Sequence, residues 1–154
     1  MKQNKLFKLW LLAVILLAGS GVTWGQSTYN LCTSTTDLVA GAKYLVVSAQ
    51  TGSGYALGLQ NTNNRAAVSV TISSSSITAT PATLSTDVKP FEITLGGSSG
   101  SWTLFDAVNN GYLYAASSSS NYLRNQSNST TWTISFSSNA AILTSAAQTS
   151  RNIL

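Results

Sequence analysis

The sequence predicts an all-β protein, and two features carry that prediction. After residue 25, short runs rich in Val, Ile, Tyr, Trp and Thr alternate with Gly, Asn and Ser, at the close spacing typical of a β-sandwich or β-barrel. Charged residues make up only 8% of the chain, so hydroxyl and amide side chains supply most of its polarity. Such a composition suits an extracellular β-protein, and no segment after residue 25 has the period of an amphipathic helix.

The N-terminal segment has the three-part form of a secretory leader. Lys2, Lys5 and Lys8 precede the apolar run LWLLAVILLAG, and the small residues of SGVTWG follow it. The unbroken apolar run is about half of the roughly 20 residues that a membrane-spanning helix needs, which argues against the alternative of an uncleaved anchor. We therefore expect residues 1–25 to be a signal peptide cleaved after Gly25, with Gly21 as an alternative site. The remaining chain would be secreted to the extracellular space or cell surface, without a membrane segment.

Removal of the leader changes the charge balance. It takes away three of the eight basic residues, whereas all four acidic residues remain, so the net charge falls from +4 to +1. The basic whole-chain composition is then largely a property of the leader, and no nucleic-acid partner is expected. Residues 26–154 have the length of one domain.

Cys32 is the only cysteine, so the chain cannot form an internal disulfide. In a secreted protein we expect Cys32 to be a small buried strand residue. An intermolecular disulfide or a reactive thiol is the alternative.

The strands are predicted from local composition, in chain order, and most are bounded by Gly, Asn or Ser. The tetrapeptide VNNG at residues 108–111 is the firmest turn, since Asn and Gly tolerate positive φ, and it predicts a hairpin. The serine runs at 73–76 and 117–120 are expected to be loops. The expected strands cover residues 29–33, 43–48, 55–59, 67–72, 77–80, 91–95, 101–106, 112–115, 122–124, 131–136, 140–145 and 151 onward.

These strands recur in order with a period of about 40 residues. FEITL, SWTLFDA, GYLYAAS and NYLRNQS match TWTISF, AAILTSA and SRNIL, and a looser earlier copy reads YNLCT, KYLVVS, GYALGLQ and AAVSVTIS. In this alignment Phe91 matches Trp132, Ile93 matches Ile134, Trp102 falls opposite Ile142 or Leu143, and Leu113 falls opposite Ile153. Three copies of a four-stranded unit predict a β-trefoil-like closed barrel; a β-sandwich or another β-barrel is the alternative.

On this reading the third copy lacks its fourth strand, and the barrel would be left with unpaired backbone. We therefore expect the chain to be a fragment, incomplete at its C-terminus and followed by further domains in a longer protein.

From Tyr29 to Leu154 the chain resembles an accessory β-domain of secreted Bacteroidetes-type bacterial proteins, found beside extracellular nuclease, hydrolase or surface modules. The resembling segments are YNLCTSTTDLVAGAKYLVVS, TWTISF, AAILT and TSRNIL. In that family the last segment is typically continued by a Tyr-Asn-containing strand and a final strand, both absent here. The resemblance implies secretion and an accessory role, and it transfers no catalytic residue.

Catalysis by this chain is not expected. It contains no His, which excludes His-based nucleophile activation and the usual zinc ligand sets. Glu92 and Asp106 lie on neighbouring predicted strands, but solvated strand-end charges explain them more simply than a glycosidase pair. Asp106, Asn109 and Asn110 offer the oxygen ligands that calcium prefers, yet the hairpin turn already accounts for them. We therefore expect no catalytic residue, no metal and no cofactor.

The remaining candidate site is aromatic. In GYLYAA the strand period places Tyr112 and Tyr114 on one face and Leu113 on the other, toward the core. Together with Tyr122 and Asn121 these tyrosines predict a ligand-binding rim, because aromatic rings and amides hold sugars. Trp102 and Trp132 are expected to be core residues instead.

The predicted function is that of a non-catalytic module that binds carbohydrate or a cell-surface ligand weakly. A purely structural spacer attached to a secreted hydrolase or nuclease is the alternative. An independent hydrolase is a third, weaker hypothesis.

Overall fold

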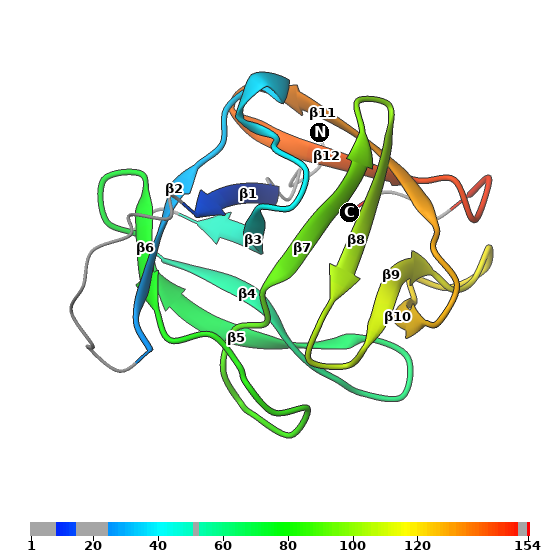
Figure 1. Cartoon of the computed structure of the whole chain (residues 1–154), viewed down its shortest axis with the longest axis horizontal. Helices are drawn as coiled ribbons and strands as arrows, with labels where there is room; N and C mark the ends of the chain where they lie inside the picture. The colour runs from blue at the N-terminus through cyan, green and yellow to red at the C-terminus, as the bar shows by residue number, and fades with distance from the viewer. Residues whose placement is uncertain (1–8, 15–24, 51–52, 151–153) are drawn as a thin grey trace, which may run out of the picture.

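The computed structural model describes residues 9–14, 25–50, 53–150 and 154, which form an all-β protein (Figure 1). The short 3-10 helix η1 (Thr35–Asp37) joins the second and third strands, and the described residues include no α-helix. None of the described helical structure has the length and apolar character of a membrane span. The strands are β1 (Leu9–Val14), β2 (Ser27–Leu31), β3 (Lys43–Gln50), β4 (Ser53–Gln60), β5 (Arg65–Thr71), β6 (Ser76–Ala79), β7 (Ile93–Ser98), β8 (Ser101–Asp106), β9 (Gly111–Ala115), β10 (Leu123–Gln126), β11 (Thr131–Ser137) and β12 (Ala140–Ser145).

The strands expected from 29–33 through 140–145 are all confirmed, with ends that differ by no more than three residues. The expected strand from Arg151 onward begins outside the described residues. Local alternation of apolar and polar side chains is a sufficient signal here because the strands are short and bounded by turn-forming residues.

Among the described strands, β1 is the one that the sequence does not predict; the short helix η1 is also not predicted. The residues of β1 belong to the apolar run of the predicted leader, yet they pair antiparallel with both β2 and β3. An apolar run of this length meets the requirements of a leader and of a fully buried strand equally well, so pattern alone does not separate the two. Cleavage of residues 1–25 concerns processing and stays a prediction.

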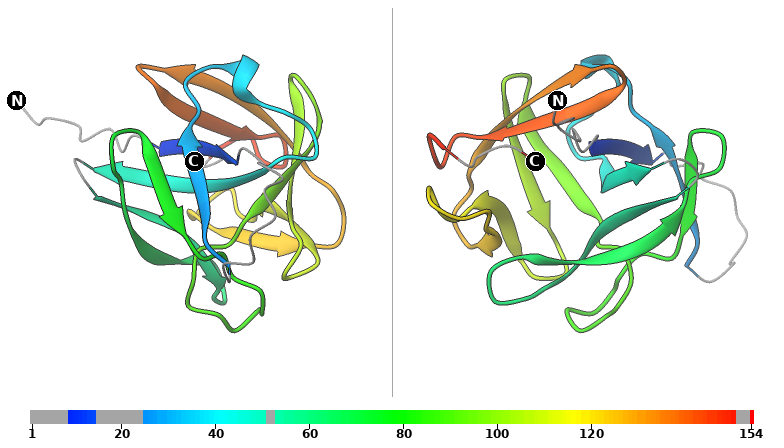
Figure 2. Two further views of the ribbon diagram at one scale, coloured as in Figure 1. Left: turned by 60° about the vertical axis from the view of Figure 1, so that its left-hand side comes forward. Right: turned by 180° about the vertical axis from the view of Figure 1, so that it is seen from behind.

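Seven strands form a nearly closed antiparallel barrel. Hydrogen-bonded pairing runs in the order β2, β1, β3, β7, β8, β11 and β12, and β12 lies beside β1. Two hairpins extend from this barrel: β4–β5 continues from β3, and β9–β10 continues from β8. Viewed from the front and from behind, β11–β12 and β4–β5 lie on opposite sides of the barrel (Figures 1 and 2).

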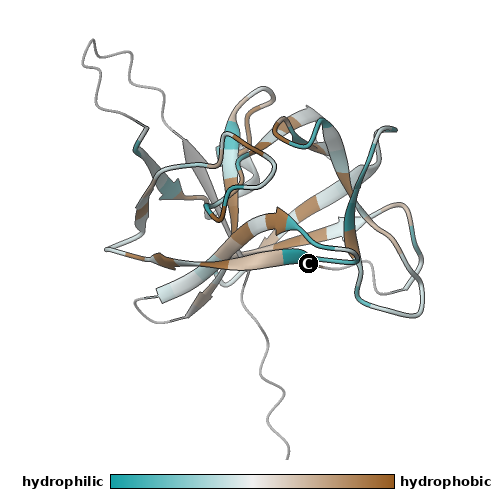
Figure 3. Ribbon diagram, turned by 90° about the horizontal axis from the view of Figure 1, so that it is seen from below, coloured by the Kyte–Doolittle hydropathy of each residue, from teal (hydrophilic) through white to brown (hydrophobic). Residues whose placement is uncertain are grey.

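The barrel interior is filled by residues two apart on successive strands, because alternate side chains of a strand point to the same face. The alternation is visible in the hydropathy of the strands (Figure 3). These interior side chains form one apolar cluster, which we call the barrel cluster. It also includes Leu113 and Leu123 from the β9–β10 hairpin, and Cys32 and Leu38. The pairs are Tyr44 and Val46, Ile93 and Leu95, Trp102 and Leu104, Trp132 and Ile134, and Ala141 and Leu143.

A second apolar cluster lies on the other face of β3. Leu45 and Val47 pack there against Tyr29 of β2 and Ile77 of β6, together with residues of β4 and β5. The strand β3 is therefore buried on both faces, which explains its continuous apolar run from Tyr44 to Val47.

The registers of two hairpins give an alignment that differs from the expected repeat alignment. Leu95 pairs with Leu104 in β7–β8, and Ile134 pairs with Leu143 in β11–β12. When these two hairpins are aligned at their two-residue turns, Ile93 and not Phe91 corresponds to Trp132, and Ala141 corresponds to Trp102. The alignment differs from the expected match because sequence similarity between short apolar strands does not distinguish registers that differ by an even number of residues. The repeat of about 40 residues itself stays a prediction.

Two further local expectations are confirmed. Asn110 adopts φ 49° in the turn between β8 and β9, as the VNNG motif predicts. Cys32 is buried, as expected, although it lies directly after the end of β2 and not within the strand.

Candidate functional site

One face of the β9–β10 hairpin gathers the three tyrosines that the sequence singles out. Tyr112 lies opposite Gln126, Tyr114 lies opposite Arg124, and the amide of Ala116 donates to the carbonyl of Tyr122 at 2.8 Å. Cross-strand partners share a face of a β-ladder, so Tyr112, Tyr114, Tyr122, Arg124 and Gln126 line the same face. We call these five residues the tyrosine face.

The opposite face of this hairpin points into the protein. Leu113 and Leu123 are buried in the barrel cluster, whereas all five residues of the tyrosine face are partly exposed. The predicted alternation of Tyr112, Leu113 and Tyr114 is therefore confirmed.

Neighbouring groups orient the side chains of the tyrosine face. The ring centroids of Phe105 and Tyr112 are 5.0 Å apart with the rings tilted by 53°. The guanidinium carbon of Arg124 lies 5.3 Å from the ring centroid of Tyr122, a cation–π geometry. Arg124 also donates from Nη2 to Oδ1 of Asn63, in the β4–β5 loop. Two hairpins that are far apart in sequence therefore meet at this face.

Asn121 is not part of the tyrosine face. It is exposed in the loop before β10, where the serine run 117–120 turns the chain. The amide of Ser120 donates to Oγ of Ser117 at 3.1 Å, so the loop is held by its own hydroxyls. Asn121 is thus close in sequence to Tyr122 but lies at the end of the hairpin.

The indoles stay inside, as expected. Trp102 and Trp132 are 6% and 1% exposed, which excludes both from contact with a large ligand. Nε1 of Trp132 donates to the carbonyl of Leu113 at 2.9 Å, and so connects the barrel to the inner face of the β9–β10 hairpin.

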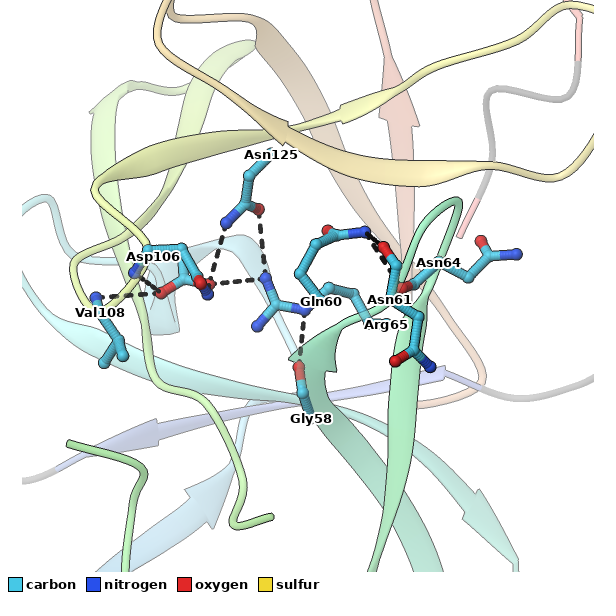
Figure 4. Close-up of polar contacts among 9 residues, drawn as sticks. Gly58, Gln60, Asn61, Asn64, Arg65, Asp106, Val108 and Asn125 are labelled. Carbon is cyan, nitrogen blue, oxygen red and sulfur yellow. Dashed lines mark hydrogen bonds and ion pairs between the residues drawn. The ribbon is translucent and has the colours of Figure 1, made fainter. Parts of the chain in front are cut away.

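Beneath the tyrosine face lies a buried ion pair that the sequence does not predict (Figure 4). Nη1 of Arg65 lies 2.6 Å from Oδ2 of Asp106, and the two side chains are 1% and 0% exposed. Arg65 also donates from Nε to the carbonyl of Gly58 at 2.6 Å and from Nη1 to Oδ1 of Asn125 at 3.1 Å. Its guanidinium carbon lies 4.7 Å from the ring centroid of Phe91.

Both oxygens of the Asp106 carboxylate accept hydrogen bonds. The carboxylate accepts from the amides of Val108 and Asn109, from Nδ2 of Asn109 and from Nδ2 of Asn125, besides Arg65. Burial alone would raise the pKa of Asp106, but the hydrogen bonds from Asn109 and Arg65 outweigh burial and hold the pKa below its ordinary value. Burial lowers the pKa of Arg65, and Asp106 opposes that change.

These contacts bear on two sites considered from the sequence: the calcium site at Asp106 and the carboxylate pair of Glu92 and Asp106. The oxygens of Asp106 are used by a turn and an arginine, so the turn interpretation is correct and calcium ligation is not supported. The other acid, Glu92, accepts from Nζ of Lys43 at 3.0 Å and from the hydroxyl of Tyr29 at 2.9 Å. Each acid is thus engaged with its own partners. The described residues contain no cluster of His, Cys, Asp or Glu that could hold a metal ion.

The sequence contains only a faint signal for the ion pair. Arg65 and Asp106 are two of very few charges, and each lies at the end of an apolar strand. Their separation of 41 residues means that only the packing of β5 beside the β8–β9 turn brings them together.

Three buried polar atoms of the described residues have no hydrogen-bond partner. They are Oε1 of Gln60, Nη2 of Arg65 and Nε of Arg124. All three belong to the region where the β4–β5 loop meets the β9–β10 hairpin. The two hairpins therefore do not provide a hydrogen-bond partner for every buried polar atom at this junction.

Comparisons with protein-family models, with curated proteins and with solved structures find no match to this chain. Its function is therefore argued from its own residues.

Proposed function

We propose that this chain is a secreted, non-catalytic β-module that binds carbohydrate or another cell-surface ligand weakly, within a larger extracellular protein. The tyrosine face is the observation that carries the proposal. It presents three partly exposed aromatic rings beside an amide and a guanidinium on one rigid hairpin. Aromatic rings stack on the apolar face of a sugar, while amide and guanidinium groups donate to its hydroxyls.

Rigidity supports this assignment. The hairpin is held from below by Leu113, Leu123 and the Trp132 hydrogen bond, and from the side by the contact of Arg124 with Asn63. A preorganised aromatic surface loses little conformational entropy when a ligand binds, which matters most for a weak binder.

We further propose that the barrel is β-trefoil-like, with β7 and β8, and β11 and β12, as two of its strand pairs. The strands β2 and β3 would form the third pair, in the place where β1 lies between them in the structure. The hairpins β7–β8 and β11–β12 support the trefoil-like arrangement, since each has a two-residue connection and an equivalent register. The hairpins β4–β5 and β9–β10 would be two of the caps. Gly-Tyr stands at the start of β9, at Gly111, and one residue into β4, at Gly54, and in both the glycine is buried and the tyrosine more exposed.

Secretion, an accessory role and further domains in the same protein remain part of the proposal. They are supported by the leader-like N-terminus and by the resemblance to accessory domains of secreted bacterial proteins. No catalytic step is assigned, because Glu92 and Asp106 are each bound to a cation of this chain.

A structural spacer is the second candidate, and one observation favours it. The stacking of Arg124 on Tyr122 and its bond to Asn63 show that part of the tyrosine face also packs one hairpin against the other. In a spacer this packing would be the whole role of the tyrosines.

Substitution of the tyrosines distinguishes the two candidates. We expect Tyr114→Ala and Tyr122→Ala each to reduce retention on a panel of insoluble polysaccharides and bacterial cell walls at least about tenfold, or about 1.4 kcal/mol. The thermal midpoint should change little, because both side chains are partly exposed. Tyr55→Ala is the matched control: Tyr55 is 49% exposed on β4, outside the tyrosine face, and its loss should leave retention unchanged.

Two results would contradict the binding proposal. One is a wild-type chain that no member of the panel retains. The other is a fall in stability for Tyr114→Ala and Tyr122→Ala in which retention falls only as far as folding does; this result supports the spacer.

A further inference from the structure

The strand β1 occupies a place in the barrel where a different strand is expected. It lies between β2 and β3 and beside β12, with Leu11 opposite Val46 and Leu9 opposite Ser48. Its residues come from the predicted leader, whereas β3, β7, β8, β11 and β12 come from the predicted domain. The barrel is thus closed in part by a segment that the proposed secretion would remove.

The hairpin registers identify which strand belongs in that place. In β7–β8, Leu95 lies opposite Leu104, and in β11–β12, Ile134 lies opposite Leu143. The pairing of Tyr44 with Ile93 repeats that of Trp102 with Trp132, so Val46 of β3 is the equivalent of Leu104.

The first strand of the first unit should then pair with β3 as β7 pairs with β8. The strand β2 has the required pattern, because Tyr29 and Leu31 are apolar and two residues apart, like Ile93 and Leu95. The equivalent register places Leu31 opposite Val46 and Tyr29 opposite Ser48. These are the positions that Leu11 and Leu9 hold in the structure.

We propose that β1 holds the place of β2 only while the leader is attached, and that β2 replaces β1 in the barrel once the leader is removed. The inference rests on the leader cleavage and the trefoil-like architecture of the proposed function. In the exchanged state β2 pairs with β3 and lies beside β12, and the barrel has six strands.

Unpaired backbone provides the driving force. Loss of β1 leaves β3 without its partner along Tyr44 to Ser48, and it exposes the neighbouring side of β12. Open strand edges and an opened apolar interior are both unfavourable in water. Apart from β1, β2 lies next in the order of paired strands, and it carries two apolar residues with the spacing that the interior needs.

The exchange is a large movement. The strand β2 is antiparallel to β1, and β1 is antiparallel to β3, so β2 runs parallel to β3 in the structure and must reverse its direction to take the place of β1. Leu31, which is level with Leu45 across Leu12, moves to a position opposite Val46, whereas Tyr29 moves from the level of the start of β3 to a position opposite Ser48. The strand β2 gives up its pairing with β6, in which Thr28 lies opposite Thr78, and the hydrogen bond from Tyr29 to Glu92. The two arrangements are therefore easily told apart.

Paired cysteines report which arrangement is present. In the structure Thr28 and Thr78 are cross-strand partners, with their hydroxyl oxygens 3.3 Å apart. In the exchanged state Thr28 faces Ala49, as the carbonyl of Thr131 faces the amide of Ala146 at 2.9 Å. In the structure β1 separates β2 from β3, and Thr28 is level with the start of β3 whereas Ala49 lies near its end. Their backbones are therefore well over the roughly 10 Å of two strand spacings apart, too far for a disulfide.

The experiment uses the full chain with Cys32→Ala, so that no native thiol interferes. One variant adds Thr28→Cys and Thr78→Cys, and the other adds Thr28→Cys and Ala49→Cys. A protease site introduced after Gly25 allows the leader to be removed in vitro from the purified protein. Disulfide formation under mild oxidation is measured by thiol labelling and intact mass, before and after cleavage. Thr131→Cys with Ala146→Cys is the positive control.

Before cleavage we expect the 28–78 pair to form a disulfide and the 28–49 pair to stay reduced. After cleavage we expect the reverse, with the 28–49 pair at least about tenfold more oxidised than before. The proposal is overturned if the 28–78 pair remains the oxidised one in cleaved, folded protein, or if the 28–49 pair forms equally in both states. A cleaved chain that loses its β-sheet circular dichroism also overturns it, because the exchanged barrel must be folded.

Secretion is tested separately. The unmodified gene is expressed in a Gram-negative host, and the N-terminus of the exported chain is read by mass spectrometry. An uncleaved or retained chain contradicts the leader proposal, whereas the exchange is decided by the in vitro cleavage alone.

Discussion

Asp106 is the residue on which the polar contacts of the interior converge. It receives backbone amides of its own turn, two asparagine side chains and the buried Arg65 guanidinium. A buried pair of this kind contributes little beyond apolar packing, but removal of one partner leaves the other charge buried and unpaired. Its main effect is to align the β4–β5 hairpin with the β8–β9 turn beneath the tyrosine face.

Asp106→Asn should therefore lower the free energy of unfolding by about 3–5 kcal/mol, because Arg65 remains buried without a counter-charge. The addition of Arg65→Met should reduce that loss, since the double variant no longer buries an unpaired charge. Urea unfolding of the two single variants, the double variant and the wild type gives the coupling energy. Additive losses in the double variant would show that the two side chains are not energetically coupled.

The same pair implies a pH dependence. Because the pKa of Asp106 is lowered in the folded state, its stabilising contribution is present above the ordinary carboxyl pKa of about 4 and is lost as the pH falls through the folded value. Wild-type stability should decrease below about pH 5, and Asp106→Asn should decrease less steeply. A residual slope is expected from Asp37 and Asp87, whose pKa values are also lowered by backbone hydrogen bonds.

At the scale of the element, two glycines of the β7–β8 hairpin have the same backbone angle and different surroundings. Gly97 and Gly100 both adopt φ +81°. A Cβ atom at Gly97 would clash with the carbonyl oxygen of Ser101, whereas a Cβ atom at Gly100 would have no neighbour within 4 Å. The comparison separates backbone strain from a steric clash.

Gly100→Ala should cost about 1–2 kcal/mol, the strain of a left-handed residue with a side chain. Gly97→Ala should cost more than that, because the added methyl group also displaces the β8 backbone. Urea midpoints of both variants measure the difference. Equal losses would mean that the hairpin moves freely at Gly97 and that this register is not fixed by close packing.

Across the whole molecule, the barrel cluster joins strands from most of the chain. Leu104 is 1% exposed and contributes to this cluster from β8, whereas Leu84 is 62% exposed in the loop before β7. The cluster includes Leu113 and Leu123, so the barrel and the β9–β10 hairpin share one core. We expect the two to unfold together.

Leu104→Ala should lower the free energy of unfolding by about 2–5 kcal/mol through a cavity in this cluster. Leu84→Ala removes the same atoms from a solvated site and should change stability by no more than about 0.5 kcal/mol. Tryptophan fluorescence and far-UV circular dichroism should report coincident transitions in both variants. Separate transitions would show that the hairpin folds independently of the barrel.

The sequence predicts the tyrosine face only in part. Period-two alternation places Tyr112 and Tyr114 together and Leu113 opposite, because the side chains of any strand alternate. The addition of Arg124 and Gln126 requires the β9–β10 register. Asn121 is exposed in the loop directly before Tyr122, and its role as a ligand-binding residue stays a prediction.

The sequence alone determined the features that depend on neighbouring residues: the strands, the turn at Asn110, the buried side of each strand and the burial of Trp102 and Trp132. These depend on alternation and on backbone preferences that act over a few residues. The tertiary structure decided the remaining features: the register of the hairpins, the ion pair of Arg65 with Asp106, and the place of Leu9–Val14 between β2 and β3. Each of these is a choice of partner across the barrel, and an apolar strand satisfies several partners equally well until the whole barrel closes around it.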